Sequence, residues 1–409
     1  MRRWEPLVSD ELLIRILTDP EVIPDPYPLM RELRETAPIF RTSSGDQWVL
    51  TRYADCRAVL RDPRFGSPEP GDSTPAITPS AVSGEERVRS MLFLNPPDHT
   101  RIRSLVSRAF TPRRVEALRE SIVALTDETI DRVAAGGGGD LMEDLAFPLP
   151  ANVISELVGV PREDRDWLRP LVADLSATLE PLTSDEVQRR AAESGEKVRN
   201  YLNDLIEARR RDPRDDLLSG LIAASDGEDR LSQEEVVVTT VLIYAAGFET
   251  TTNLIGNMVL TLLRHPAQLD RLQADRSLVA TAVEEVLRFE SPVQLDGRIA
   301  TESVAIGEHA IEQGQMVMTL LGAANRDPDT VADPDTFDVG RDEVPLLSFG
   351  SGIHYCLGAS LARLEGQVVL EQLLDRFVRW ELQEPDPPWR NRMTLRGLDR
   401  LPIRLEERT

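Results

Sequence analysis

The sequence predicts a mainly α-helical protein with small peripheral β-sheets, on three observations. The longest helical pattern runs from about residue 233 to 264 and is apolar almost all round from Val236 to Ala246, as a buried helix should be. Further helical patterns recur along most of the chain. The β-like segments are few and short.

Composition and charge restrict the class of protein. The chain has 409 residues without an internal repeat or linker, so we expect a single domain over residues 1–409, and a monomer. The net charge of −23 argues against nucleic acid or an anionic membrane as a partner. No transmembrane span or signal peptide is recognisable, and the two cysteines, Cys56 and Cys356, lack a CxxC neighbour. We therefore expect a cytoplasmic protein.

The first third of the chain mixes helices with one hairpin. Prolines at 24, 26 and 28 precede a short helix that ends near residue 36, and 39–41 and 48–51 flank the turn cluster 43–46 as a β-hairpin. Residues 53–60 form a helix in which Cys56 is a packing residue. The stretch from 66 to 87 is rich in Pro, Gly and Ser, and we interpret it as a loop that covers a substrate.

Helices dominate the rest of the chain. Thr111 and Pro112 begin a helix that ends before Gly136, and Ser232 with Glu235 forms a capping box for the long helix. Other helices are expected near 148–158, 162–178, 185–210, 266–273 and 277–290. Short strands are expected at 294–304 and 316–320, and a last hairpin at 393–405.

A glycine-rich loop from Phe349 to Gly358 presents Cys356 where a new helical pattern begins. The dipole of a helix N-terminus favours a thiolate over a thiol, and the thiolate is the form that binds metal. Gly350, Gly352 and Gly358 let a flat ligand approach the backbone. A lone cysteine is usually only a buried packing residue. The full pattern of Phe, two residues, Gly, three residues, Cys, one residue and Gly is much more specific.

A second unusual segment, residues 245–251, stands in the middle of the long helix. It places Glu249 beside Thr250 and Thr251, behind Gly247, in surroundings that are otherwise apolar. The segment could be a solvent-facing turn, or its threonines could bond back to preceding carbonyls. Buried polar groups there would require a reason.

Together, the cysteine loop and this segment resemble the cytochrome P-450 family. The resemblance covers nearly the whole chain and implies the P-450 fold, with haem b buried between the long central helix and the cysteine-loop helix. It implies Cys356 as the axial iron ligand, and Thr250 and Glu249 as the residues that deliver protons to dioxygen. The other residues that it places around the haem are His99, Arg103, Ala246, Gly247, Arg298, Phe349, Gly352, His354 and Gly358; of these, His99, Arg103, Arg298 and His354 match propionate ligands.

The resemblance extends to a structural ion pair. Glu285 and Arg288, followed by Ser291 and Pro292, match the family's Glu-x-x-Arg pair, and the segments 325–328 and 335–341 resemble the part that completes its network. The chain departs from many relatives at Leu346 and Ser351, neither of which ligates iron.

The implied activity is that of a monooxygenase that inserts one oxygen atom of dioxygen into a hydrophobic small molecule. No flavin or iron–sulfur motif is present, so electrons are expected from a ferredoxin or flavodoxin and its reductase. Arg101, Arg108, Arg113, Arg114 and Arg363 are candidates for a basic docking patch. A peroxide-driven peroxygenase and a haem-binding sensor without turnover remain open as alternatives.

The substrate pocket is expected to be lined by largely apolar segments. Its candidate residues are Leu242, Ile243, Ala246, Val293, Gln294, Leu295, Thr394 and Leu395. Such a lining suits a macrolide, terpenoid, fatty acyl group or aromatic natural product, and the sequence does not select among these.

Overall fold

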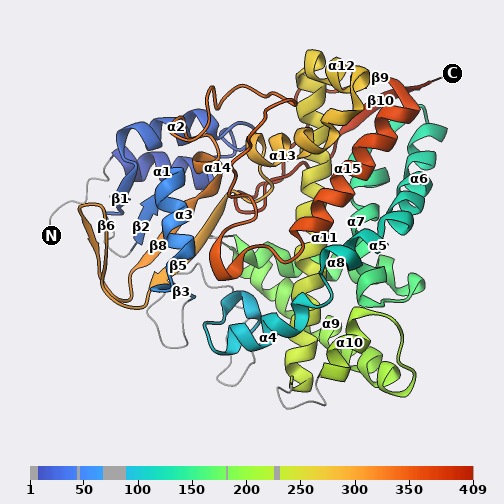
Figure 1. The fold of residues 1–409 in the computed structure, drawn as a ribbon, viewed down its shortest axis with the longest axis horizontal. Helices are drawn as coiled ribbons and strands as arrows, with labels where there is room; N and C mark the ends of the chain where they lie inside the picture. Colours follow the sequence, from blue (N-terminus) through green and yellow to red (C-terminus); the bar gives the residue numbers. More distant parts are fainter. Residues whose placement is uncertain (1–7, 44–46, 68–88, 181–182, 225–230, 409) are drawn as a thin grey trace. The chain divides into compact units, whose positions relative to one another are not determined.

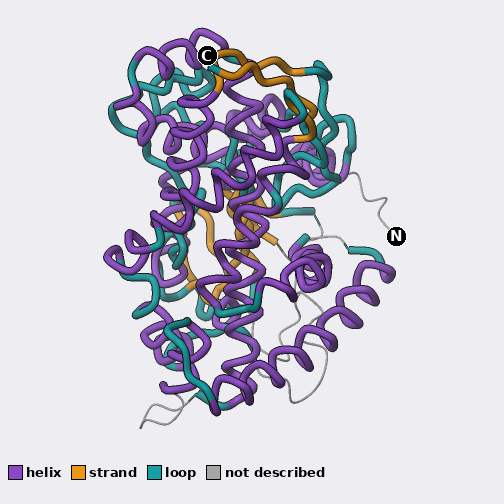
Figure 2. Tube along the Cα trace, turned by 90° about the vertical axis from the view of Figure 1, so that its right-hand side faces the viewer, coloured by secondary structure: helices purple, strands orange, loops and turns teal. Residues whose placement is uncertain are grey.

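Helices account for most of the chain, and strands occupy only short segments (Figure 2). The computed structural model describes residues 8–43, 47–67, 89–180, 183–224 and 231–408. The prediction of a mainly α-helical protein with small sheets is confirmed, whereas nearly all of the expected loop at 66–87 lies outside the described residues. The chain divides into two compact units, and the prediction of a single domain stays a prediction.

The first unit takes in Met1–Pro75, Asn253–Cys356 and Leu374–Thr409, and its main element is a five-stranded sheet. The strand order is β1-β2-β8-β5-β3, with β2 parallel to β8 and the other neighbours antiparallel. The strands are β1 Ile39–Arg41, β2 Gln47–Leu50, β3 Phe65–Gly66, β5 Leu295–Ala300 and β8 Met316–Leu320. All five residues of β8 are buried, as befits a central strand covered on both faces. The predicted hairpin of β1 and β2 is confirmed.

The helices α1 Val8–Thr18, α2 Tyr27–Thr36, α3 Tyr53–Arg61 and α14 Leu321–Ala324 lie beside this sheet (Figure 1). The first unit also contains α12 Pro266–Ala274 and α13 Val279–Phe289. The core between the sheet, α3 and α14 contains Trp48, Cys56, Val59 and Val317, so the prediction that Cys56 is a packing residue is confirmed. A separate two-stranded ribbon pairs β6 Val304–Ile306 with β7 His309–Ile311.

The predicted ion pair on α13 is fully buried. The Arg288 guanidinium donates to both carboxylate oxygens of Glu285, at 2.8 and 2.7 Å, and both side chains are 0% exposed. Arg341 also pairs with Glu285, and Arg288 donates to the carbonyls of Asn325 and Pro334. The network expected from segments 325–328 and 335–341 is therefore confirmed, and it ties those loops to α13.

The C-terminal tail differs from the prediction of a hairpin within 393–405. Strand β10, Pro402–Glu407, pairs with β9, Phe377–Leu382, because the buried positions Ile403 and Leu405 face the same layer as Phe377 and Trp380. Residue 395 instead makes an isolated bridge to Val293.

Arg396 in this tail is one of the largest fully buried side chains. It pairs with Glu290 at 2.5 Å and donates to the carbonyls of Ile23 and Pro24. Its guanidinium also stacks on the Trp389 ring, 3.8 Å from the ring centroid. The tail thus fastens the segment before α2.

The second unit takes in Ala76–Thr252 and Leu357–Leu373 and is helical apart from β4, Gly138–Asp140. Its helices are α4 Asp98–Ser107, α5 Pro112–Ala117, α6 Arg119–Ala135, α7 Pro148–Val158, α8 Arg165–Ser176, α9 Asp185–Arg211 and α10 Leu217–Ala224. Two further helices, α11 Gln233–Arg264 and α15 Ala359–Arg376, belong partly to each unit. The core combines α4, α7, α8, α9, α10 and the first half of α11.

One predicted helix of the second unit is in fact two. The chain turns at Leu118. Its N–H donates to the carbonyl of Val115, three residues earlier, and not to the carbonyl four residues earlier as in an α-helix. At this point α5 ends and α6 begins. The predicted capping box of α11 is confirmed, since the Glu235 N–H donates to the Ser232 hydroxyl at 3.1 Å and the Ser232 N–H donates to the Glu235 carboxylate at 2.7 Å.

Candidate functional site

The cysteine loop, in the first unit, is held by tight backbone turns. The Cys356 N–H donates to the carbonyl of Phe349 at 2.9 Å, and Gly350 and Gly352 adopt φ values of 66° and 71°. A Cβ atom at Gly352 would collide with the carbonyl of Leu60 on α3, so only glycine fits there. Phe349 is buried and Cys356 is half-buried. The loop therefore holds a half-buried cysteine in a backbone that its glycines fix locally.

The helix after the cysteine starts later than expected. The first helical residue of α15 is Ala359, and the Ala362 N–H donates to the carbonyl of Gly358. Cys356 thus precedes the first turn by three residues. Gly358 has open space where a Cβ atom would stand, as Gly350 does.

The middle of α11, in the second unit, carries one partly open face. Leu242, Ala246 and Thr250 follow each other at four-residue spacing; Ala246 is exposed and the other two are half-buried, although the helix is buried on either side of them. The Thr250 hydroxyl donates to the carbonyl of Ala246 at 2.6 Å. The small side chain of Ala246 and the hydroxyl of Thr250 therefore lie on the partly open face of the helix.

The neighbouring residues of α11 face the protein interior. Ile243 is 5% exposed and belongs to the core, and Glu249 is 1% exposed. A Cβ atom at Gly247 would stand 2.8 Å from Cδ1 of Ile154, so this glycine lets α7 approach α11. The structure thereby explains Gly247 by packing, and its predicted contact with a cofactor stays a prediction.

The four predicted propionate partners come from three places. His99 and Arg103 lie one turn apart on α4, where His99 is buried and Arg103 half-buried. His354 is half-buried in the cysteine loop, two residues before Cys356. Arg298 on β5 is 6% exposed and donates to Asp296 at 2.5 Å. All four side chains can be cationic, which suits a ligand that carries two carboxylates.

Two segments that are expected to line the substrate pocket lie side by side within the first unit. Val293 bridges Leu395, and the Gln294 N–H donates to the carbonyl of Thr394 at 3.0 Å. Gln294 and Leu295 are buried, while Val293 is half-buried. The tail therefore lies against the segment that leads into β5, and the role of these residues in binding a substrate stays a prediction.

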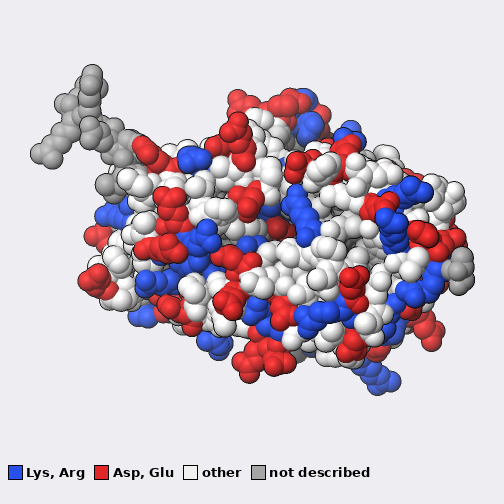
Figure 3. Space-filling view, turned by 90° about the horizontal axis from the view of Figure 1, so that it is seen from above, with Lys and Arg blue, Asp and Glu red and all other residues white. Residues whose placement is uncertain are grey.

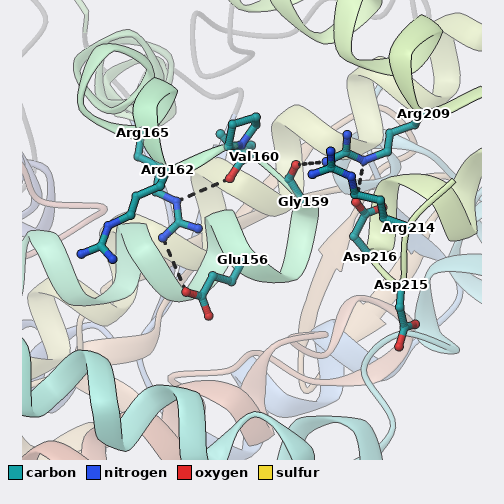
Figure 4. A pocket seen from close by; sticks show the side chains of 10 residues that line it. Glu156, Gly159, Val160, Arg162, Arg165, Arg209, Arg214, Asp215 and Asp216 are labelled. Carbon is teal, nitrogen blue, oxygen red and sulfur yellow. Dashed lines mark hydrogen bonds and ion pairs between the residues drawn. The ribbon is translucent and has the colours of Figure 1, made fainter. Parts of the chain in front are cut away.

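A hollow of about 340 Å³ in the second unit is a different feature (Figure 4). Arg209 donates to Asp216 at 2.7 Å and to the carbonyl of Gly159 at 2.6 Å, and Arg165 approaches Glu156 and the carbonyl of Val160. Because these arginines already have acidic or carbonyl partners, the hollow is a structural junction of α7, α9 and α10.

The donor set fits a haem bound through one thiolate. The described part of the chain has no group of three or more His, Cys, Asp or Glu side chains placed to hold an ion, and a haem iron needs one axial protein ligand only. Cys356 is half-buried, Gly350 and Gly358 have open space where a Cβ atom would stand, and the predicted propionate partners are side chains of arginine and histidine. Among the described residues, no helix is long and apolar enough to cross a membrane.

Sequence reasoning did not single out Asn253 and Asn257, which are both 0% exposed. They follow Glu249 on α11 at four-residue spacing, so a search for polar residues along one helical row would have found them.

Comparison with known proteins gives a consistent result. The family model described as "Cytochrome P450" matches residues 26–405. The chain is 43% identical to cytochrome P450 107B1 of Saccharopolyspora erythraea, over 92% of this chain and 94% of that protein. It is 41% identical to 6-deoxyerythronolide B hydroxylase of the same organism, over 93% of this chain and 96% of that protein.

A solved structure agrees with these sequence relatives. P450BioI, in complex with an acyl carrier protein that bears hexadec-9Z-enoic acid, superimposes with a TM-score of 0.87 at 39% identity, over 95% of this chain and 99% of that chain.

Proposed function

The chain belongs to the cytochrome P450 family and is a P450 monooxygenase, and from this we propose that it inserts one oxygen atom of dioxygen into a hydrophobic small molecule. The observation that carries the proposal is the loop around Cys356, which holds a half-buried cysteine on a backbone that only glycine permits at Gly352. The partly open face of α11 supports it.

Members of this family carry haem with a cysteine thiolate as ligand, and we assign that ligand to Cys356. Bound haem supplies dioxygen activation, and donation from the thiolate favours cleavage of the O–O bond. His99, Arg103, Arg298 and His354 would hold the propionates of haem b. Arg298 would then exchange or share its present partner, Asp296.

Thr250 and Glu249 would deliver the protons that the reaction with dioxygen consumes. The Thr250 hydroxyl lies on the open face of α11, and its bond to the carbonyl of Ala246 leaves the oxygen free to accept a hydrogen bond from water. Glu249 is buried next to it and would pass protons to that side of the helix. Ala246 leaves room beside the hydroxyl for a small ligand.

The substrate would lie against Leu242, Ala246 and the assembled segments at 293–295 and 394–395. These are mostly apolar, so we propose a secondary-metabolite-like molecule. Two similar proteins support this proposal, since one is named 6-deoxyerythronolide B hydroxylase and the other was solved with an acyl carrier protein ligated to hexadec-9Z-enoic acid. Hydroxylation and epoxidation are both compatible with this lining.

Electrons would come from a ferredoxin or flavodoxin with its reductase, since the sequence carries no flavin or iron–sulfur motif. Of the predicted docking arginines, Arg108, Arg113 and Arg114 are exposed. Arg101 instead pairs with Glu235 and Asp98 and is less available for a partner. An acidic electron carrier suits the remaining patch.

The decisive experiment uses the two cysteines as a matched pair. Reduced, carbon-monoxide-bound wild-type protein should show the red-shifted Soret band of a haem thiolate. Cys56→Ser should keep that band, because Cys56 is a buried packing residue, whereas Cys356→Ser should lose it. A folded wild-type protein without the band would refute the proposed function.

A further inference from the structure

The second half of α11 carries a row of polar side chains in apolar surroundings. Glu249, Asn253, Asn257 and Thr261 follow one another at four-residue spacing, the separation at which helical side chains are neighbours, and His265 comes directly after the helix ends at Arg264. The first four are between 0% and 4% exposed, and the residues between them include Leu254, Ile255, Met258, Val259 and Leu260. From Glu249 to Thr261 the row spans about 18 Å of helix at 1.5 Å per residue.

The inner amide of this row needs hydrogen-bond partners. Neither the oxygen nor the nitrogen of the Asn253 side chain has a partner among the described residues, although Asn253 is 0% exposed. A buried amide left without hydrogen bonds costs considerable free energy, and bound water normally supplies the missing partners. A Cβ atom at Gly397 would collide with this amide, so the glycine creates the space that the amide occupies.

The next amide is fixed in place. The Asn257 nitrogen donates to the carbonyls of Glu290 and Arg396, both at 3.2 Å, so its oxygen points in a defined direction. That oxygen is buried and has no partner among the described residues. Asn257 can therefore hold a water molecule one turn from Asn253.

The outer end of the row reaches a partly exposed histidine. Nδ1 of His265 lies 2.8 Å from the carbonyl of Thr261, and the ring is half-buried beside Phe289 and Phe337. With Nδ1 beside the carbonyl of Thr261, Nε2 is the ring nitrogen that is left for a hydrogen bond to water. The outer end of the row therefore lies beside a half-buried imidazole.

We propose that Asn253 and Asn257 hold a file of bound water along α11 through which protons from the His265 end reach Glu249. Water is the ligand, and the two asparagines are positioning residues that hold it without changing their own protonation. The inference rests on the proposed function, because it gives Glu249 a source of the protons that monooxygenation consumes.

The test compares Asn253→Leu with Thr252→Val in the haem-loaded protein. Thr252 is also 0% exposed and its hydroxyl also lacks a partner among the described residues, but it lies off the row. Asn253→Leu should lower product per electron by about tenfold, less than the ~10²–10⁴-fold that a whole general acid contributes. It should also raise the solvent isotope effect, whereas Thr252→Val should leave both close to wild type.

Two further measurements keep the test independent of turnover. A high-resolution crystal structure of the wild type should show ordered water on both amide atoms of Asn253, and the Asn253→Leu structure should lack it. Asn253→Ser, which can still bind water, should recover most of the coupling even if the leucine variant folds poorly.

The inference fails if the crystal structure shows no water at Asn253, or if Asn253→Leu stays as coupled as wild type while Glu249→Gln does not. Either of these two results would leave the proposed function intact. A wild type without the haem-thiolate spectrum would instead overturn the proposed function.

Discussion

Thr250 is the residue at which local helix chemistry and the proposed reaction meet. Threonines in helices often bond back to a carbonyl one turn earlier, and the bond from Thr250 to Ala246 has that form. The bond alone would be structural. Its place on a partly open face, next to a buried acid, is what gives it a proposed role.

Replacing Thr250 with alanine should separate oxygen consumption from product formation. We expect Thr250→Ala to lower product per electron by at least about tenfold, since one positioned proton donor contributes ~10²–10⁴-fold. Product and peroxide are measured per electron supplied, with Thr250→Ser as the control that keeps the hydroxyl. Turnover driven by hydrogen peroxide that is insensitive to Thr250→Ala, without a dioxygen-dependent activity, would favour the peroxygenase alternative.

Glu365 on α15 is an ionisable residue in an unfavourable place. Burial alone raises the pKa of its carboxyl well above the usual 4.5, and one carboxyl oxygen has no partner among the described residues. A raised pKa in the folded state means that the folded protein binds this proton more tightly than the unfolded chain does. The free energy of unfolding is therefore not reduced by Glu365 below pH 4.5, and it declines as the pH rises above that value.

Glu365→Gln should consequently stabilise the protein in a pH-dependent way. The gain in unfolding free energy should be near zero below pH 4.5. It should grow by about 1.4 kcal/mol per pH unit above that value, until it levels off at the folded-state pKa. Denaturant unfolding at several pH values measures it, with the exposed Glu371→Gln as control. Equal stability of Glu365→Gln and wild type at neutral pH would contradict the prediction.

At the scale of elements, the junction of α7, α9 and α10 depends on one buried pair. The side chains of Arg209 and Asp216 are 5% and 6% exposed, and Arg209 also binds the carbonyl of Gly159, where α7 ends at a φ of 93° (Figure 4). Removing one partner of a buried pair leaves an uncompensated charge.

Arg209→Met should therefore destabilise the fold by about 3–5 kcal/mol. The neighbouring Arg210 offers a matched control, because its pair with Glu207 is exposed on the same helix. Arg210→Met should change the unfolding free energy by no more than about 1 kcal/mol. Thermal or denaturant unfolding of both variants makes the comparison, and equal losses would refute the assignment.

Elements with a local cause were predictable from the sequence. The capping box at Ser232 and the Glu285–Arg288 pair depend on residues three apart, and the structure has both. The pairing of β10 with β9 joins segments about twenty residues apart, so the residues next to either strand do not predict it. The break between helices at Leu118 likewise has no signal in the neighbouring sequence. The cysteine loop was recognisable by pattern, whereas the pairing of Arg101 with Glu235 is a tertiary contact that no local pattern indicates.

At the scale of the whole molecule, charge restricts how a partner can approach. The net charge is −23, and acidic side chains are interspersed with arginines on the face shown in Figure 3. An acidic electron carrier would be repelled at long range, so the exposed arginines near α5 would have to attract it locally.

Arg113→Glu combined with Arg114→Glu should slow reduction by an acidic ferredoxin, most strongly at low ionic strength, because association between opposite charges is screened by salt. Arg190→Glu on α9, which is also partly exposed, serves as control. Stopped-flow reduction over a salt series measures the effect. Unchanged rates in the double variant would place the docking surface elsewhere.

The buried side chain of Arg396 also sets an order of events during synthesis. Its contact with Ile23 joins residues separated by 373 positions in the sequence. Domains acquire structure as the chain emerges, with N-terminal parts appearing first. The segment before α2 must nevertheless wait, with those carbonyls without Arg396 as a partner, until residue 396 has left the ribosome. The segment at Ile23 and Pro24 therefore reaches these native contacts long after it is synthesised.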